Sequence, residues 1–133
     1  MLKIEHIGIA VNSLEEANAK YEKLLGRAPY KTESVESEGV NTSFFQLGES
    51  KLELLEASKE NSPIKRFLDK NGEGMHHIAF EVQDIHAEID RLAGEGFELI
   101  GDGPKAGADN KLVCFFHPKS TGGLLIELCQ EKQ

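Results

Sequence analysis

Two stretches, Ile4-Glu5-His6-Ile7-Gly8-Ile9-Ala10-Val11 and Met75-His76-His77-Ile78-Ala79-Phe80-Glu81-Val82, repeat one pattern at a distance of 71 positions. In both copies the histidine, the isoleucine after it and the final valine fall in register. Self-similarity at a fixed spacing indicates a duplicated structural unit. The alternation of apolar residues is typical of a strand. The repeat therefore predicts two similar modules, each of which begins with a β-strand.

A capped helix is expected after each copy of the pattern. Ser13-Leu14-Glu15-Glu16 forms a capping box, in which the serine side chain accepts from early helix amides and the second glutamate reaches back. Asp84 is the corresponding N-cap in the second module. The first helix is predicted to end at Gly26 and the second near Gly94 or Gly96, because glycine commonly terminates helices.

Each module is predicted to end in two strands joined by a turn. Ser43–Leu47 and Lys51–Leu55 flank a short turn in the first half, and Lys111–Phe116 and Leu124–Leu128 flank a longer, glycine-rich turn in the second. We therefore predict an α+β fold of two tandem β-α-β-β-β modules. These modules are expected to form a curved, open mixed β-sheet cleft with the helices on the outside.

The chain, residues 1–133, is predicted to be a single domain, which agrees with its length. Module one spans about residues 1–60, a linker helix about residues 61–71, and module two about residues 72–133. Ser62-Pro63 supports the linker helix, because it places an N-cap residue before a proline in the first turn. Asn71-Gly72 is expected to close this helix.

The overall composition excludes several classes of protein. With 39% hydrophobic and 29% charged residues, the chain has the composition of a soluble globular protein. The net charge of −8 argues against nucleic-acid binding through phosphates. No apolar run is long enough to span a membrane, and the N-terminus enters a strand pattern directly, so we expect a cytoplasmic location. Cys114 and Cys129 lack metal-binding or redox spacing and are predicted to be buried, reduced thiols.

Four polar residues are predicted to share the strand face that does not pack on helices: His6, Glu53, His77 and Glu127. Side chains alternate along a strand, so Ile7 and Ile9 lie under the helix and His6 points away. A carboxylate among aliphatic residues on a half-buried strand is costly unless it is paired or ligating. Two histidines and two carboxylates form a set that binds one divalent ion, such as Zn, Co, Mn, Ni or Fe.

The alternative interpretation is two surface carboxylates and two core histidines with satisfied hydrogen bonds. For any one of the four residues alone, that interpretation is favoured. The symmetric placement of one histidine and one glutamate in each module favours the metal site for the set. Parity places His76 on the helix-packed side, His86 is expected to be a solvated helix residue, and His117 a structural residue at a turn. A solvated loop is predicted to hold Glu33, Glu36 and Glu38.

The sequence resembles the vicinal oxygen chelate superfamily and, within it, the methylmalonyl-CoA epimerase family. The resemblance covers nearly the whole chain. Besides the opening repeat, it rests on these segments: Leu52-Glu53-Leu54-Leu55-Glu56, Ser62-Pro63-Ile64, Phe67-Leu68, Gly74-Met75-His76-His77-Ile78-Ala79, His117-Pro118-Lys119-Ser120-Thr121-Gly122-Gly123 and Leu125-Ile126-Glu127-Leu128.

The resemblance implies a metal-dependent enzyme that interconverts the (R) and (S) forms of methylmalonyl-CoA. The C2 proton would be removed and returned through a metal-stabilised enolate. His6, Glu53, His77 and Glu127 fall on the family's metal-ligand positions, and Glu127 is also a plausible catalytic base. The implied partners are a small acyl-CoA substrate and a second copy of the chain in a homodimer, with no nucleic acid and no membrane.

The sequence departs from part of the family at the strand Val40-Asn41-Thr42-Ser43-Phe44, where some members carry a second acid. A water on the metal or Lys119 is a candidate for the missing group, so this assignment stays open. Lys65, Lys111 and Lys119 are candidates for contacts to CoA phosphates, although each taken singly is more typical of an ordinary surface lysine.

Three other functions remain open for this fold. A glyoxalase-type isomerase would use a similar metal on a glutathione hemithioacetal. An extradiol dioxygenase would use Fe(II) held by two histidines and one carboxylate. This sequence offers four candidate ligands, one more than such a site uses. A non-enzymatic protein that sequesters a drug would use the same cleft, but such members tend to lack the ligands that this sequence retains.

Overall fold

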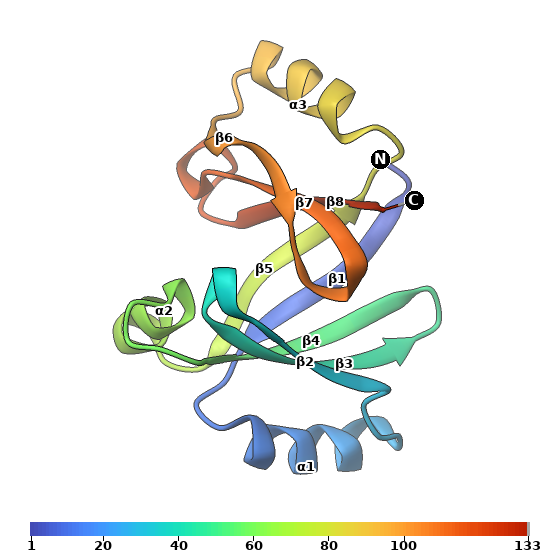
Figure 1. The fold of residues 1–133 in the computed structure, drawn as a ribbon, viewed down its shortest axis with the longest axis vertical. Coiled ribbons are helices and arrows are strands. Elements are labelled where there is room, and N and C mark those ends of the chain that lie inside the picture. Colours follow the sequence, from blue (N-terminus) through green and yellow to red (C-terminus); the bar gives the residue numbers. More distant parts are fainter. Residues whose placement is uncertain (133) are drawn as a thin grey trace. The chain divides into compact units, whose positions relative to one another are not determined.

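The computed structural model describes residues 1–132, and Figure 1 shows the course of the chain. The elements are β1 (Lys3–Ala10), α1 (Leu14–Leu25), β2 (Lys31–Val35), β3 (Val40–Leu47), β4 (Ser50–Ala57), α2 (Pro63–Asn71), β5 (Gly74–Glu81), α3 (Ile85–Gly94), β6 (Leu99–Ala106), β7 (Lys111–Phe116) and β8 (Leu125–Glu131). The order β-α-β-β-β therefore occurs twice, with α2 between the copies. This confirms the predicted repeat and its linker helix.

The chain divides into two compact units, one made of residues 1–6 and 77–133 and the other of residues 7–76. The boundary lies inside β1, directly after His6, and inside β5, directly before His77. The units therefore differ from the sequence modules, because the first residues of the chain belong with the second half. The single domain with modules at about 1–60 and 72–133 stays a prediction.

The strands belong to a mixed sheet of eight strands. The order is β2-β3-β4-β1 in the first half and β5-β8-β7-β6 in the second, so the two halves repeat one topology. β5 runs parallel to β8, and β7 antiparallel to β8. β3 is antiparallel to β4, with Phe44 opposite Glu53, and Phe115 is likewise opposite Glu127. The predicted α+β class is confirmed.

The predicted helix caps are present. The Ser13 side chain accepts a hydrogen bond from the amide of Glu16, and Asp84 accepts from that of Ala87. Gly26 ends α1 with φ at 72°, a left-handed conformation that glycine adopts without strain from a side chain. These local signals determine where each helix begins and where α1 stops.

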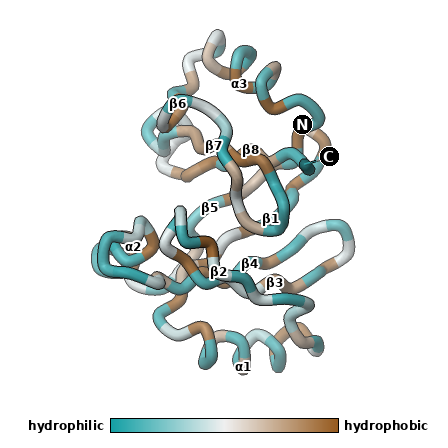
Figure 2. Tube along the Cα trace, viewed as in Figure 1, coloured by the Kyte–Doolittle hydropathy of each residue, from teal (hydrophilic) through white to brown (hydrophobic). Residues whose placement is uncertain are grey.

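The apolar faces of the helices pack on the strands as strand parity predicted. α1 packs on β3 and β4 over a core that includes Val11, Ala17 and Phe45. α3 packs on β6 and β8 over a second core, whose buried residues are Val82, Ile85, Leu92, Cys114, Phe116 and Leu128. Figure 2 shows hydrophilic and hydrophobic residues alternating along both helices, as expected for amphipathic segments.

The prediction of a solvated loop at Glu33, Glu36 and Glu38 is wrong. Glu33 lies in β2, opposite Thr42 of β3, and Glu36–Glu38 forms a short 3-10 helix. β2 stands at the end of the strand order, and edge strands commonly carry charged side chains. When only the sequence is read, a charged edge strand such as this one is therefore difficult to distinguish from a loop.

Two predictions from composition can also be compared with the structure. Cys114 and Cys129 are free and buried, as predicted. Within residues 1–132, the helices are all too short or too polar to cross a lipid bilayer.

Candidate metal centre

Three of the four predicted ligands meet inside one compact unit. The Nε2 atom of His6 lies 3.0 Å from Nε2 of His77 and 3.2 Å from Oε1 of Glu127. The Nε2 atom of His77 lies 2.9 Å from the same carboxylate oxygen. All three residues are buried, with at most 5% of their surface exposed. Three strands, β1, β5 and β8, therefore bring three donor atoms to one point.

The strand pairing explains why these side chains converge. β5 and β8 are parallel neighbours with Ala79 opposite Glu127, which places His77 and Glu127 close together on one face. The ring of Phe115, on the next strand, stands edge-on to His77 with centroids 6.0 Å apart. Ile126 and Leu128 point to the α3 core on the other face. An aromatic ring therefore lies beside the polar cluster and an apolar core lies behind it.

The two histidines keep the Glu127 carboxyl ionised. Burial by itself would raise the pKa of Glu127, because a charged carboxylate loses its hydration. The charges and hydrogen bonds of His6 and His77 outweigh that effect and lower the pKa from 4.5 to about 2. At neutral pH this side chain is therefore a buried carboxylate, which is the form that ligates metals and accepts protons.

The donor set fits a divalent cation. The ligand atoms of His6, His77 and Glu127 all lie within 4.8 Å of one another. Two ring nitrogens 3.0 Å apart share at most one proton without repulsion, so at least one lone pair points into the cluster. A carboxylate oxygen with two imidazole nitrogens is a set suited to Zn, Co, Mn, Ni or Fe. The three donor atoms are therefore close enough together to share one such ion.

Glu53, the fourth predicted ligand, belongs to the other compact unit, residues 7–76. It lies on β4 with 6% of its surface exposed and faces Phe44 across the strand pair. Leu52 and Leu54 pack under α1, so Glu53 is on the face that parity predicted. Its role as a metal ligand stays a prediction.

The remaining histidines lie where the sequence placed them. His76 packs edge-on against Phe67 of α2, with ring centroids 5.0 Å apart. His86 is exposed on α3. His117 lies at the turn, where its ring accepts a hydrogen bond from the amide of Lys119.

Sequence reasoning missed Glu5. Only 2% of this residue is exposed, and its Oε1 atom lies 2.9 Å from Nδ1 of His6. A signal for it was present, because Glu5 shares a strand face with Ile7 and Ile9 and directly precedes a predicted ligand. Glu5 is therefore buried and contacts the imidazole ring of His6 instead of facing solvent.

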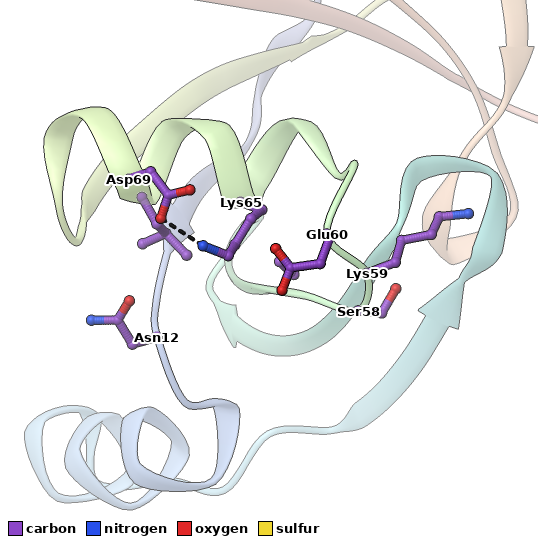
Figure 3. A pocket seen from close by; sticks show the side chains of 8 residues that line it. Asn12, Ser58, Lys59, Glu60, Lys65 and Asp69 are labelled. Carbon is purple, nitrogen blue, oxygen red and sulfur yellow. Dashed lines mark hydrogen bonds and ion pairs between the residues drawn. The ribbon is translucent and has the colours of Figure 1, made fainter.

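The three lysines considered for phosphate contacts differ in their surroundings. Lys65 pairs with Asp69 at 2.6 Å beside a pocket of about 420 Å³, which Asn12 and Glu60 also line (Figure 3). Lys119 is exposed, with its ammonium 3.8 Å from Glu98. Lys111 is buried, so the expectation of a surface lysine is wrong there.

The amino-acid sequence is similar to a known protein superfamily and to named epimerases. The model of the Glyoxalase/Bleomycin resistance protein/Dioxygenase superfamily matches residues 5–115. An ethylmalonyl-CoA/methylmalonyl-CoA epimerase of Cereibacter sphaeroides is 44% identical over 130 residues, covering 96% of this chain and 97% of the relative.

Solved structures agree with the sequence comparison. A methylmalonyl-CoA epimerase from Mycobacterium tuberculosis superimposes with a TM-score of 0.93 at 32% identity, covering 98% of this chain and 89% of that one. A methylmalonyl-CoA epimerase in complex with methylmalonyl-CoA and NH4+ superimposes with a TM-score of 0.94 at 34% identity, covering 98% and 95%.

Proposed function

The chain belongs to the glyoxalase/bleomycin resistance protein/dioxygenase superfamily, and on that premise we propose that it is a methylmalonyl-CoA epimerase. The reaction interconverts the (R) and (S) forms by removing the C2 proton from one face and adding a solvent-derived proton to the opposite face. The observation that carries the proposal is the buried cluster of His6, His77 and Glu127, in which an ionised carboxylate lies within hydrogen-bond distance of two imidazoles.

The chemistry of the substrate suits this cluster. C2 of methylmalonyl-CoA lies between a thioester carbonyl and a carboxylate, so loss of its proton gives an enolate. A divalent ion held by the cluster would supply Lewis acidity that stabilises the negative charge of this enolate. We assign proton transfer at C2 to Glu127, because this side chain is ionised and buried. With a pKa of about 2 it is a weak base, so the acidity of C2 must be raised by its surroundings.

We propose that the metal is held by His6, His77 and Glu127, with Glu53 as the fourth ligand. The three clustered donors support the first part of this assignment. The duplication supports Glu53, because Glu53 and Glu127 each face a phenylalanine across an equivalent strand pair. The ion is one of Co, Zn, Mn, Ni or Fe, since the donor set suits each of them.

Deuterium exchange tests the proposed reaction directly. Metal-loaded protein incubated in D2O with one epimer of methylmalonyl-CoA is expected to introduce deuterium at C2 and to yield both epimers. The Glu127→Gln variant should lose this exchange. The matched control is Glu98→Gln, which alters an exposed carboxylate near Lys119 and should leave the rate unchanged. Absence of exchange with the wild-type protein, loaded with each candidate metal, would reject the epimerase.

A second candidate follows from the same three residues. Two histidines and one carboxylate are the ligands of many Fe(II) oxygenases, so the clustered donors alone also suit oxygen chemistry. The full-length similarity to epimerases favours the isomerase. Oxygen consumption by the Fe(II)-loaded protein with a catechol would support the oxygenase, and we expect none.

We further propose that the protein acts as a cytoplasmic homodimer on an acyl-CoA substrate. Small modules bury little surface alone and gain core by pairing, which supports the dimer. The acyl-CoA assignment rests on the relatives and on the complex with methylmalonyl-CoA. Light scattering at micromolar concentration should give twice the mass of the 14.7 kDa chain.

A further inference from the structure

A buried acidic and basic pair lies behind His6, on the side of the ring away from His77 and Glu127. We infer that Glu5 is a positioning residue, which fixes the tautomer and orientation of His6 for metal binding, and that Lys111 holds Glu5 in place. This inference rests on the proposed metal site. It adds a function for two residues that are not themselves ligands.

The contact between Glu5 and His6 determines where the imidazole proton lies. Oε1 of Glu5 is 2.9 Å from Nδ1 of His6, while Nε2 of the same ring faces His77 and Glu127. An ionised carboxylate only accepts hydrogen bonds, so Nδ1 must carry the proton and donate it. When the ring is neutral, which is the form that ligates a metal, Nε2 carries a lone pair directed into the cluster and no longer donates to Glu127. A carboxylate that orients a ligating histidine in this way commonly strengthens metal binding.

A different role for Glu5, as a ligand in a second metal group with His6 and Cys129, agrees less well with the contacts. The ligand atoms of these residues also lie within 4.8 Å of one another. However, Sγ of Cys129 donates to the carbonyl oxygen of Phe80, and burial raises the pKa of this thiol. The Nδ1 atom that donates to Glu5 cannot also ligate an ion. Glu5 therefore acts on His6 and not on a second metal.

Lys111 supplies the positive charge that a buried carboxylate needs. Its Nζ lies 4.0 Å from Oε2 of Glu5 and 3.0 Å from Oε1 of Glu131. Only 7% of the Lys111 side chain is exposed, whereas the Glu131 side chain is 74% exposed. The ammonium group is thus placed between a buried and an exposed carboxylate. An uncompensated charge at Glu5 would be costly in this interior, so Lys111 stabilises the ionised form that orients His6.

The duplication does not account for this pair. At the spacing of 71 positions, Glu5 corresponds to His76, and Lys111 corresponds to Val40. His76 packs on Phe67, and Val40 belongs to the apolar core under α2. The pair is therefore a feature of one half, acquired outside the symmetric pattern that supplies the ligands.

The inference is tested first in the metal-free protein, by long-range 1H–15N NMR of the His6 ring at mildly alkaline pH. The wild-type protein should show the tautomer with the proton on Nδ1. The Glu5→Gln variant should lose the dominance of that tautomer, because an amide can also donate to Nδ1. Finding the proton of wild-type His6 on Nε2, or an unchanged tautomer in Glu5→Gln, would overturn the inference. This measurement requires no metal and no activity.

Metal affinity provides the second measurement, by competition of Zn²⁺ between the protein and a chelating dye. Glu5→Gln should weaken binding by about 10- to 100-fold, the usual range for a partner of a ligating histidine. Lys111→Met should weaken it by a smaller factor. The matched control is Glu131→Gln, which removes the exposed partner of Lys111 and should change affinity less than about threefold.

The outcomes separate this inference from the proposed function. If wild type binds Zn²⁺ and Glu5→Gln binds it equally well, the role of Glu5 is rejected and the metal site stands. If wild type binds none of the candidate ions, the proposed metal site is rejected, and the tautomer measurement still decides whether Glu5 orients His6. If Glu5→Gln does not fold, the tautomer of the wild-type ring decides alone.

Discussion

Glu53 and Glu127 occupy the same place in the two halves of the chain but have different surroundings. Each faces a phenylalanine across an antiparallel strand pair, Phe44 and Phe115 respectively. Phe115 stands edge-on to His77, next to the cluster that contains Glu127. Phe44 instead contacts Tyr30, and the ammonium group of Lys31 lies 5.2 Å from its ring. Duplication thus reproduced the backbone register, while the residues around each copy diverged.

The difference shows that equivalent register does not mean equivalent function. Glu127 lies within hydrogen-bond distance of two imidazoles in its own compact unit, and we propose both a ligand role and a base role for it. Glu53 lies on an equivalent strand in the other unit, and we propose only a ligand role for it. The following predictions test this contrast, beginning with the largest expected effect.

Isosteric removal of each carboxylate should separate the two roles. Glu127→Gln should lower the C2 exchange rate by about 10²- to 10⁴-fold, because the proposed general base is lost. Glu53→Gln should lower it less than about tenfold, since an amide oxygen can still ligate a metal. Single-turnover exchange in D2O measures both rates. Equal losses in the two variants would contradict the contrast.

The pH dependence of stability should reveal the ion pairs of Glu127 in the metal-free protein. Its pKa is lowered from 4.5 to about 2, so its contribution is complete above pH 4.5 and is lost as pH falls toward 2. Between pH 7 and pH 3 the loss should be on the order of 2 kcal/mol.

Urea unfolding of wild-type and Glu127→Gln protein at pH 7 and pH 3 measures the contribution of ionised Glu127 to the free energy of unfolding. The wild-type protein should lose more stability than the variant on acidification. Parallel curves for wild type and Glu127→Gln would show that the histidines do not stabilise the carboxylate.

The helix caps should behave alike in the two halves, in contrast to the carboxylates. Ser13→Ala and Asp84→Ala each remove an acceptor from an N-terminal helix amide. Each should reduce the free energy of unfolding by about 1 kcal/mol without changing the exchange rate. Thermal unfolding measures the first effect. A change in exchange rate would mean that helix ends influence the site.

The smallest expected effect is on the reactivity of Cys114, because the charge on Glu127 raises the pKa of this neighbouring thiol. Burial, together with the Glu127 charge, raises the pKa of Cys114 to about 12. At pH 8 its thiolate fraction is on the order of 10⁻⁴, so iodoacetamide should modify native protein very slowly. Mass spectrometry gives the rate. Glu127→Gln should speed the reaction by a small factor, whereas Glu53→Gln should leave it unchanged.

The sequence by itself determined the repeat and the faces of the strands. The spacing of 71 positions is visible when the two halves of the sequence are compared. The caps at Ser13 and Asp84 and the alternation in β1 and β5 are local signals, because they depend on hydrogen bonds and side-chain direction within a few residues. They were sufficient to place His6, His77 and Glu127 on the correct faces. They failed at Glu33, where an edge strand carries the polarity of a loop.

Only the tertiary structure decided which residues share an environment. The first six residues belong to the same compact unit as the second half, and this brings His6 to His77 and Glu127. It also places Lys111 beside Glu5, although 106 positions separate the two residues in the sequence. Such pairing depends on strand order and on which charges are buried together. Neither is encoded by periodicity or by spacing, because both arise when distant strands become neighbours in one sheet.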